Sequence, residues 1–140
     1  MITEIRKQDC RDFKKIAAIK NRDPLTEKII ACAYKVHSEL GSGFNEKVYH
    51  NALEIALKQQ GLRYQTEKSF TVSYQGNYVG RFKLDLIIED KVIVEVKALT
   101  GNIPTVFELQ VLSYLKASGY KIGLLVNFGN KSCQVGRLMV

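Results

Sequence analysis

Residues 82–98 contain two short apolar runs that are separated by the polar triplet 89–91. Such a pattern predicts a β-hairpin. Charged side chains interrupt both runs, Asp85 in the first and Glu95 and Lys97 in the second. Because strand side chains alternate between the two faces of a sheet, Glu95 and Lys97 must share one face. The hairpin therefore carries charged groups within an otherwise apolar sheet.

The register of this hairpin decides whether Asp85 joins the other two charges. A three-residue loop places the aliphatic residues of both strands on one face, pairing Leu84 with Val96, Leu86 with Val94 and Ile88 with Val92. Burial of one aliphatic face is the usual determinant of register. The same register places Asp85 directly opposite Glu95, with Lys97 two residues along. A two-residue loop would split the apolar face and separate the carboxylates.

Two opposed carboxylates repel each other unless a positive charge lies between them. Mg²⁺ favours oxygen ligands and uses only one or two carboxylates together with waters. Beside such a cation, Lys97 is placed to orient or deprotonate a water, or to neutralise charge on a phosphoryl group. The alternative is an ion pair of Lys97 with Asp85 or Glu95 on a solvated sheet face. The D-x9-E-x-K spacing alone leaves both interpretations open.

Composition restricts the class of protein. A chain of 140 residues predicts a single folded unit with its own core. Its 46% hydrophobic and 25% charged residues are typical of soluble globular proteins, and its net charge of +7 favours a polyanionic partner. The three scattered cysteines contain no C-x-x-C pair, which favours reduced thiols and a cytoplasmic location. No secretion signal or membrane span is predicted.

The chain divides into residues 1–23, a basic N-terminal extension, and residues 24–140, the folded domain. Within residues 1–22 there are seven Lys or Arg and three acids, and the apolar spacing allows a short amphipathic helix. We interpret this segment as a terminal extension, and a docking arm or a basic nucleic-acid contact are the alternatives.

Two helices are expected before the hairpin. Asp23 and Pro24 form a helix start and Gly41 a helix stop. The second helix is predicted from Glu46 to Gln60.

Three polar residues of these helices are site candidates. Glu46 lies in a first turn, where the helix dipole favours a carboxylate, and Tyr49 follows on the same face. A first-turn Glu is often only a capping charge, and Glu46 joins the site only if its helix end faces Asp85 and Glu95. We expect His37 to be packed and hydrogen-bonded, because no second His or Cys lies at ligand spacing; a role near the active site is the alternative.

The remaining strands and helix complete the sheet. On the predicted strand 78–88, Arg81 and Lys83 share a face with Asp85, which indicates either contact with a phosphate backbone or mere balance of the acids. A helix over 105–117 places Gln110 and Tyr114 on one face.

The apolar run 122–126 is typical of a buried parallel strand, and residues 131–140 indicate a last edge strand. The predicted fold is therefore α/β (α+β). Two helices precede a mixed sheet of three antiparallel strands, a crossover helix, a parallel strand and an edge strand.

This order resembles the restriction-endonuclease-like core of the PD-(D/E)xK nuclease superfamily, and within it the chain resembles the small GxxExxY protein family. The family's motifs match residues 24–140 in order: G-F-N-E-K-V-Y at 43–49, V-H-x-x-L-G around His37, Asp85, E-V-K at 95–97, Q-V-L-S-Y at 110–114 and G-L-L-V-N-F-G at 123–129.

The resemblance implies a role for each site residue. Asp85, Glu95 and the Val96 carbonyl would hold Mg²⁺ or Mn²⁺, and Glu46 would approach through water or a second cation. Lys97 would position the attacking water and stabilise the transition state. The remaining implied roles fall to Gln110, which would hold Lys97 or a phosphate, to Tyr114, which would pack beneath it or contact backbone, and to Tyr49 and His37 as supporting residues.

The function implied by the resemblance is metal-dependent hydrolysis of phosphodiester bonds in DNA, with RNA the less favoured substrate. The alternative is a non-catalytic nucleic-acid-binding or regulatory module that keeps the acidic site for a structural cation. A homodimer or a protein partner that supplies specificity is compatible with the small size of the domain.

Overall fold

The structure is a computed structural model, and it describes residues 3–4 and 23–140. The amphipathic helix predicted within residues 1–22 lies outside the described residues. Thr3–Glu4 forms a short strand, β1. In the described part of the chain, no helix is both long and apolar enough to cross a membrane.

Two helices precede the sheet, as predicted. Helix α2 spans Pro24–Leu40, and the Asp23 side chain caps it by accepting a hydrogen bond from the Leu25 amide at 3.1 Å. Helix α3 spans Glu46–Gln59. The joint between them, residues 41–45, begins at Gly41, whose φ of 71° favours glycine.

The strands form one six-stranded sheet in the order β1-β6-β5-β4-β3-β2. Their bounds are Tyr64–Tyr74 (β2), Asn77–Ile88 (β3), Val92–Lys97 (β4), Ile122–Asn127 (β5) and Gln134–Met139 (β6). Strands β2, β3 and β4 are antiparallel, and β5 is parallel to β4 after the crossover helix α4, Thr105–Ser118. This confirms the predicted fold class. The predicted edge strand, β6, carries β1 on its outer side.

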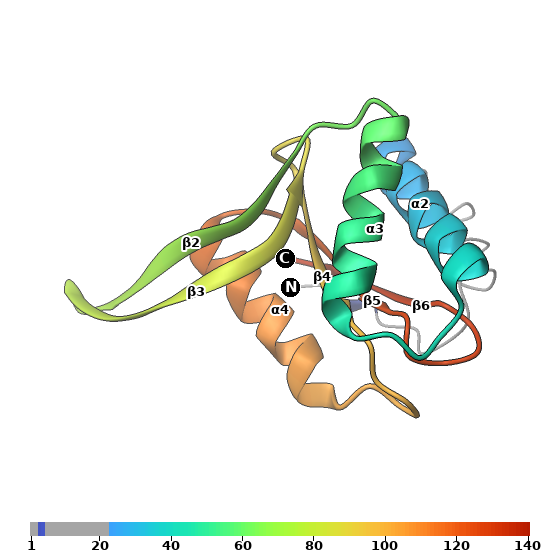
Figure 1. Cartoon of the computed structure of the whole chain (residues 1–140). Coiled ribbons are helices and arrows are strands. Elements are labelled where there is room, and N and C mark those ends of the chain that lie inside the picture. The colour runs from blue at the N-terminus through green and yellow to red at the C-terminus, as the bar shows by residue number, and fades with distance from the viewer. Residues whose placement is uncertain (1–2, 5–22) are drawn as a thin grey trace.

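Helices cover both faces of the sheet (Figure 1). On one face α2 and α3 bury a cluster that includes Tyr49, Leu53 and Phe128. On the other face α4 buries a second cluster with Val111 and Leu115. Full burial of such a side chain contributes roughly 1.5–3 kcal/mol, so both faces stabilise the strands between them.

One prediction about the hairpin faces is wrong. Leu86 and Ile88 pack under α2 and α3 as expected, but Leu84 belongs to the cluster under α4. The reversal occurs at the level of Asp85. There Glu67 of β2 has a φ of 51°, and the pairing of β2 with β3 skips the Glu67–Asp85 pair. A residue in the left-handed conformation interrupts the regular alternation of side chains along a strand. In the outer part of the hairpin, even-numbered residues of β3 therefore face α4, whereas Leu86 and Ile88 face α2 and α3.

The β2–β3 hairpin extends well beyond the rest of the molecule (Figure 1). Its two-residue turn is Gln75–Gly76, with φ values of 49° and 78°. Positive φ at both positions is the geometry of a type I′ turn, whose twist matches that of the flanking strands.

Candidate active site between β3 and β4

The site lies where strands β3 and β4 separate. Leu86 pairs with Val94 and Ile88 with Val92, which confirms the three-residue register. Beyond Leu86 and Val94, hydrogen bonds made by the side chains of Asp85 and Glu95 take the place of regular backbone pairing.

Asp85 and Glu95 bind each other's strands at this point. The Asp85 carboxylate (Oδ2) accepts a hydrogen bond from the Val96 amide at 2.9 Å. The Glu95 carboxyl (Oε1) accepts one from the Asp85 amide at 3.2 Å. The two acids are therefore held side by side, each by the backbone of the opposite strand.

Burial and charge together change the chemistry of Glu95. The side chain is 5% exposed. Burial, and then the charge of Asp85, raise the pKa of Glu95 to about 8, and Lys97 opposes this in part. Near neutral pH, and without a cation, the Glu95 carboxyl therefore holds a proton.

Lys97 lies near the two acids but makes a different contact. Its ammonium lies 4.3 Å from the centroid of the Phe107 ring, a cation–π contact. Among the described residues, Lys97 forms no ion pair with Asp85 or Glu95. The ion-pair alternative for this face is therefore not the arrangement that the fold adopts.

Helix α4 supplies one wall of the site. Tyr114 stacks on Phe82 with ring centroids 4.3 Å apart. Burial, and then the charges of Glu95 and Asp85, raise the pKa of Tyr114, so its hydroxyl lies within electrostatic range of both acids. Gln110 lies on the helical stripe between Phe107 and Tyr114 and is half-buried, but within residues 23–140 it makes no hydrogen bond with Lys97 or the two acids.

Helix α3 approaches from the other side. A hollow of about 240 Å³ is lined by Glu46, Lys47, His50, Glu67, Asp85 and Val96. Glu46 is exposed, and it lines the same hollow as Asp85 although 39 positions separate them. His50 is engaged with Glu54 at 3.1 Å.

Tyr49 fixes the joint that precedes Glu46. Its hydroxyl donates to the Gly41 carbonyl at 2.6 Å and accepts from the Phe44 amide at 3.2 Å. Its ring is fully buried and stacks on Phe128 with centroids 4.7 Å apart. Tyr49 is therefore a positioning residue that holds the start of α3.

His37 is packed and hydrogen-bonded, as expected. Its Nε2 lies 2.8 Å from the Asn130 carbonyl, and its ring stacks on Phe128. The Asn130 side chain in turn binds both the amide and the carbonyl of Gly101 at 2.8 Å. His37 thereby supports the loop that follows Lys97.

Asn127 and Phe107 were not predicted as site residues. Asn127 is fully buried and binds Leu99 through both its oxygen (2.8 Å) and its nitrogen (2.9 Å). It anchors the chain directly after Lys97. The spacing of Phe107 from Gln110 and Tyr114, which is helical, was the available signal for Phe107.

Arg81 and Lys83 lie on the projecting hairpin rather than at the carboxylates. Both are exposed, and Arg81 donates to the Ser69 hydroxyl at 3.3 Å. Neither is among the groups that shift the pKa of Glu95.

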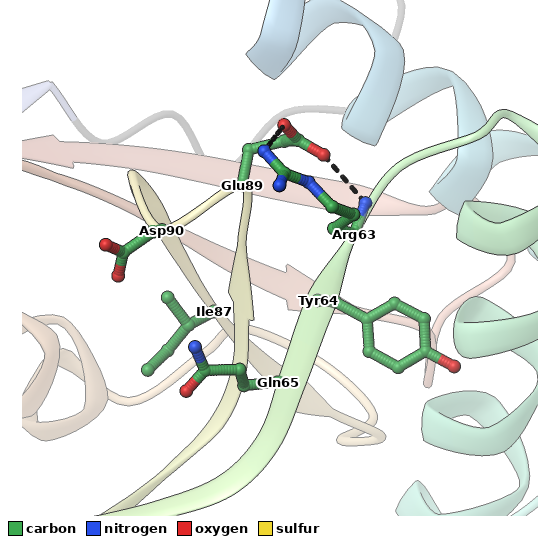
Figure 2. A pocket seen from close by; sticks show the side chains of 6 residues that line it. All are labelled: Arg63, Tyr64, Gln65, Ile87, Glu89 and Asp90. Atoms are coloured by element: carbon green, nitrogen blue, oxygen red, sulfur yellow. Dashed lines mark hydrogen bonds and ion pairs between the residues drawn. The ribbon is translucent and has the colours of Figure 1, made fainter.

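A larger hollow of about 410 Å³ lies elsewhere, between the start of β2 and the β3–β4 turn. Figure 2 shows Arg63 and Glu89 joined by hydrogen bonds at one end of it. The Glu89 carboxylate accepts hydrogen bonds from the Arg63 amide (2.7 Å) and guanidinium (3.2 Å), which lower the pKa of Glu89. These charges already satisfy one another, so we do not assign the active site to this hollow.

The donor set between β3 and β4 fits a hard cation. The described residues contain no group of three or more His, Cys, Asp and Glu side chains arranged to hold a metal. Mg²⁺, however, needs only one or two carboxylates and fills its other positions with waters and carbonyls. Two adjacent carboxyl groups, one of them disfavoured as an anion by burial and by the charge of the other, meet that need.

Comparisons with known proteins agree with this geometry. Residues 23–138 match the family model described as PD-(D/E)XK nuclease superfamily. The crystal structure of SSO0001 is similar, with a TM-score of 0.55 and 19% identity over 94% of this chain, which spans 62% of that protein. At that identity the likeness shows the fold alone. No curated protein matches the chain.

Proposed function

The chain belongs to the PD-(D/E)XK nuclease superfamily, and on that premise we propose that it is a Mg²⁺- or Mn²⁺-dependent nuclease that hydrolyses phosphodiester bonds in DNA. The observation that carries the proposal is the Asp85–Glu95 pair, in which two carboxyl groups are held together while burial opposes the ionisation of Glu95. A purely structural pair would be stabilised by a basic partner, and Lys97 instead lies over Phe107.

The chain's own groups have distinct parts in this proposal. Asp85, Glu95 and the Val96 carbonyl would hold the cation, which when bound supplies Lewis-acid stabilisation of charge on the phosphate. Lys97 would orient the attacking water and neutralise charge on the phosphoryl oxygens as it builds up. Glu46, which lines the hollow beside Asp85, would bind a further water or cation.

Helix α4 would position Lys97. Phe107 contacts its ammonium, and Gln110, one turn further along, would bind Lys97 or a phosphate oxygen. Tyr114 would close the site from below. We further propose that the chain is a GxxExxY-type member, because Glu46 and Tyr49 have separate uses here, one lining the hollow and the other holding the helix start.

A non-catalytic nucleic-acid-binding module is the competing function, with a cation that only stabilises the fold. The exposure of Glu46 favours it, because an exposed carboxylate in a first helical turn can serve as a capping charge alone.

A cleavage assay separates the two. Supercoiled plasmid, linear duplex, single-stranded DNA and single-stranded RNA are incubated with Mg²⁺ or Mn²⁺ and wild type, Lys97→Ala or the exposed control Lys131→Ala. We expect cleavage of DNA that falls roughly 10²-fold or more in Lys97→Ala, the usual cost of losing one preorganised charge-stabilising donor, and not in the control. Equal cleavage by Lys97→Ala, or no cleavage of any substrate, would overturn the nuclease assignment.

A further inference from the structure

The β2–β3 hairpin is longer than the fold requires. Strand β4, which continues the sheet, is Val92–Lys97, whereas β3 begins as far back as Asn77. The outer part of the hairpin, residues 68–83, projects away from the remaining strands (Figure 1). We call residues 68–83 the arm.

The two faces of the arm differ in what they meet. Phe70 and Phe82 stack across the strands at 5.6 Å, and Phe82 also stacks on Tyr114 of α4. This face is therefore covered by α4. Alternation places Ser69, Thr71, Arg81 and Lys83 on the opposite, outer face, where Thr71 is paired with Arg81 and Ser69 with Lys83.

All charged side chains of the arm are positive. Lys68, Arg81 and Lys83 are its charged residues, and no acid lies between positions 68 and 83. The flanking acids, Glu67 and Asp85, are at its base and line the hollow of the candidate site. A positive strip thus begins where the acidic site ends.

The tip of the arm is aromatic and exposed. Tyr74 is 65% exposed and Tyr78 64%. Tyrosine hydroxyls donate hydrogen bonds to phosphates, and tyrosine rings contact sugars and bases. Exposed aromatic rings next to uncompensated basic residues are suited to a polyanion more than to an acidic or neutral protein surface.

We propose that the outer face and tip of the arm bind the backbone of duplex DNA at a distance from the scissile phosphate, which rests on the proposed nuclease function. At about 3.4 Å per residue, Asp85 and Asn77 are separated by roughly 27 Å along β3, or about eight base pairs of a duplex. The arm therefore contributes affinity for DNA that extends this far from the carboxylates.

The test is a binding measurement that needs no cleavage. Fluorescence anisotropy is recorded in chelator, in the Lys97→Ala background, with duplexes of about 30 and about 8 base pairs. The arm variant combines Arg81→Gln with Lys83→Gln. The charge-matched control combines Lys28→Gln on α2 with Lys131→Gln before β6, both exposed.

We expect the arm variant to bind the long duplex about tenfold more weakly, with the slope of log K against log salt reduced by roughly 1.8, because each lost phosphate contact removes about 0.9. The short duplex should lose a similar factor, because Lys83 and Arg81 lie only two and four residues from Asp85 along β3 and a duplex of about 8 base pairs still reaches them. Length dependence belongs to the tip. Tyr74→Ser with Tyr78→Ser should weaken binding of the long duplex a few-fold and binding of the short duplex by less than about twofold, because a short duplex centred on the carboxylates extends only about 14 Å along the arm.

Three results would overturn the proposal that the arm binds DNA. The first is an arm variant whose salt slope equals that of the control, and the second is a tip variant (Tyr74→Ser with Tyr78→Ser) that loses equal affinity for both duplex lengths. The third is no wild-type binding to duplex DNA, including binding that is confined to RNA. Failure of the cleavage assay with a normal length-dependent loss here would instead remove the nuclease and keep the arm as a DNA-binding element.

Discussion

The Glu95 carboxyl and the Asp85 carboxylate are on neighbouring strands, and each accepts an N–H from the other strand. This exchange holds the two side chains together, although their charges repel. The repulsion is reduced in the metal-free protein by a proton on Glu95, whose pKa is raised to about 8 by burial and by Asp85. In the metal-free protein this proton neutralises the charge that a bound cation would otherwise neutralise.

Stability should therefore fall with pH. Glu95 has a folded-state pKa of about 8 against an ordinary value of 4.5, so between these values the folded state binds more protons than the unfolded state. The contribution is complete below pH 4.5 and is lost as the pH rises through about 8. Since a tenfold change in proton affinity is about 1.4 kcal/mol, the loss is of the order of a few kcal/mol.

Melting curves in chelator from about pH 5 to about pH 9 check this. Glu95→Gln is the matched variant, because it keeps the shape and cannot titrate. The wild-type Tm should decline relative to Glu95→Gln across this range, and saturating Mn²⁺ should remove the decline. Parallel curves for the two proteins in chelator would show that Glu95 does not titrate in this window.

Asp85→Asn should leave the metal-free fold intact. An amide oxygen can still accept from the Val96 amide, and one of the two repelling charges is gone. We expect a Tm in chelator that is unchanged or raised, and loss of most of the Tm increase that Mg²⁺ or Mn²⁺ gives the wild type. Glu39→Gln, an exposed acid on α2, is the control. A Tm well below wild type in chelator would make Asp85 a structural residue.

At the scale of strands and helices, alternation of aliphatic residues was sufficient to predict the hairpin register, because one-residue slips expose an entire apolar face. The same rule failed for Leu84. Glu67 adopts positive φ in the middle of β2, and Glu is not a residue whose presence indicates that conformation. The reversal of faces at Asp85 therefore left no sign in the sequence.

The loop after β4 depends on a close backbone approach at Gly129. A Cβ at this position would overlap the backbone of Leu99, which cannot move aside as a flexible side chain would. Gly129→Ala should cost about 1–3 kcal/mol, the usual cost of overpacking, and lower the Tm by several degrees.

Gly80→Ala is the matched comparison for this change. A Cβ at Gly80 would meet nothing within 4 Å, so its Tm should stay within about 2 °C of wild type. Thermal denaturation followed by circular dichroism measures both. Equal Tm values for the two variants would contradict the close approach of Gly129 to the Leu99 backbone.

The start of α3 depends on the Tyr49 hydroxyl. Tyr49→Phe removes the hydrogen bond to Gly41 and leaves the Phe44 amide without its partner, at a cost of about 1–3 kcal/mol. Tyr78→Phe, at the exposed tip of the arm, should have no measurable effect on Tm. Urea denaturation of both variants tests this, and similar midpoints would mean that the joint before Glu46 is held by packing alone.

At the scale of the whole molecule, the site collects groups from both layers of helices. Helix α3 brings Glu46 to one side of the gap between β3 and β4, and α4 brings Phe107 and Tyr114 to the other. These groups lie around the point at which the regular pairing of β3 with β4 ends, beyond Leu86 and Val94.

Sequence reasoning placed Asp85 beside Glu95, and the structure holds the two side chains together, because strand alternation links residues that are close in the chain. The position of Glu46 beside Asp85 depends on tertiary packing, and only the motif resemblance indicated it. Phe107 and Asn127 were missed, since a ring in a helix and an amide in a buried strand have many ordinary uses. Both act on Lys97 or the loop beyond it, and only the packing of α4 and β5 reveals this.

In the mechanism that we propose, Asp85 and Glu95 bind a divalent cation in exchange for a proton. Calorimetric titration with Mn²⁺, in two buffers of different ionisation enthalpy, measures the affinity for the cation and the number of protons released on binding. At about pH 7 we expect saturable binding with release of about one proton per cation, and release that falls toward zero at about pH 9.5, where Glu95 is already ionised. Asp85→Asn should bind at least about tenfold more weakly. Binding of equal strength in Asp85→Asn, or binding without proton release at about pH 7, would contradict the account.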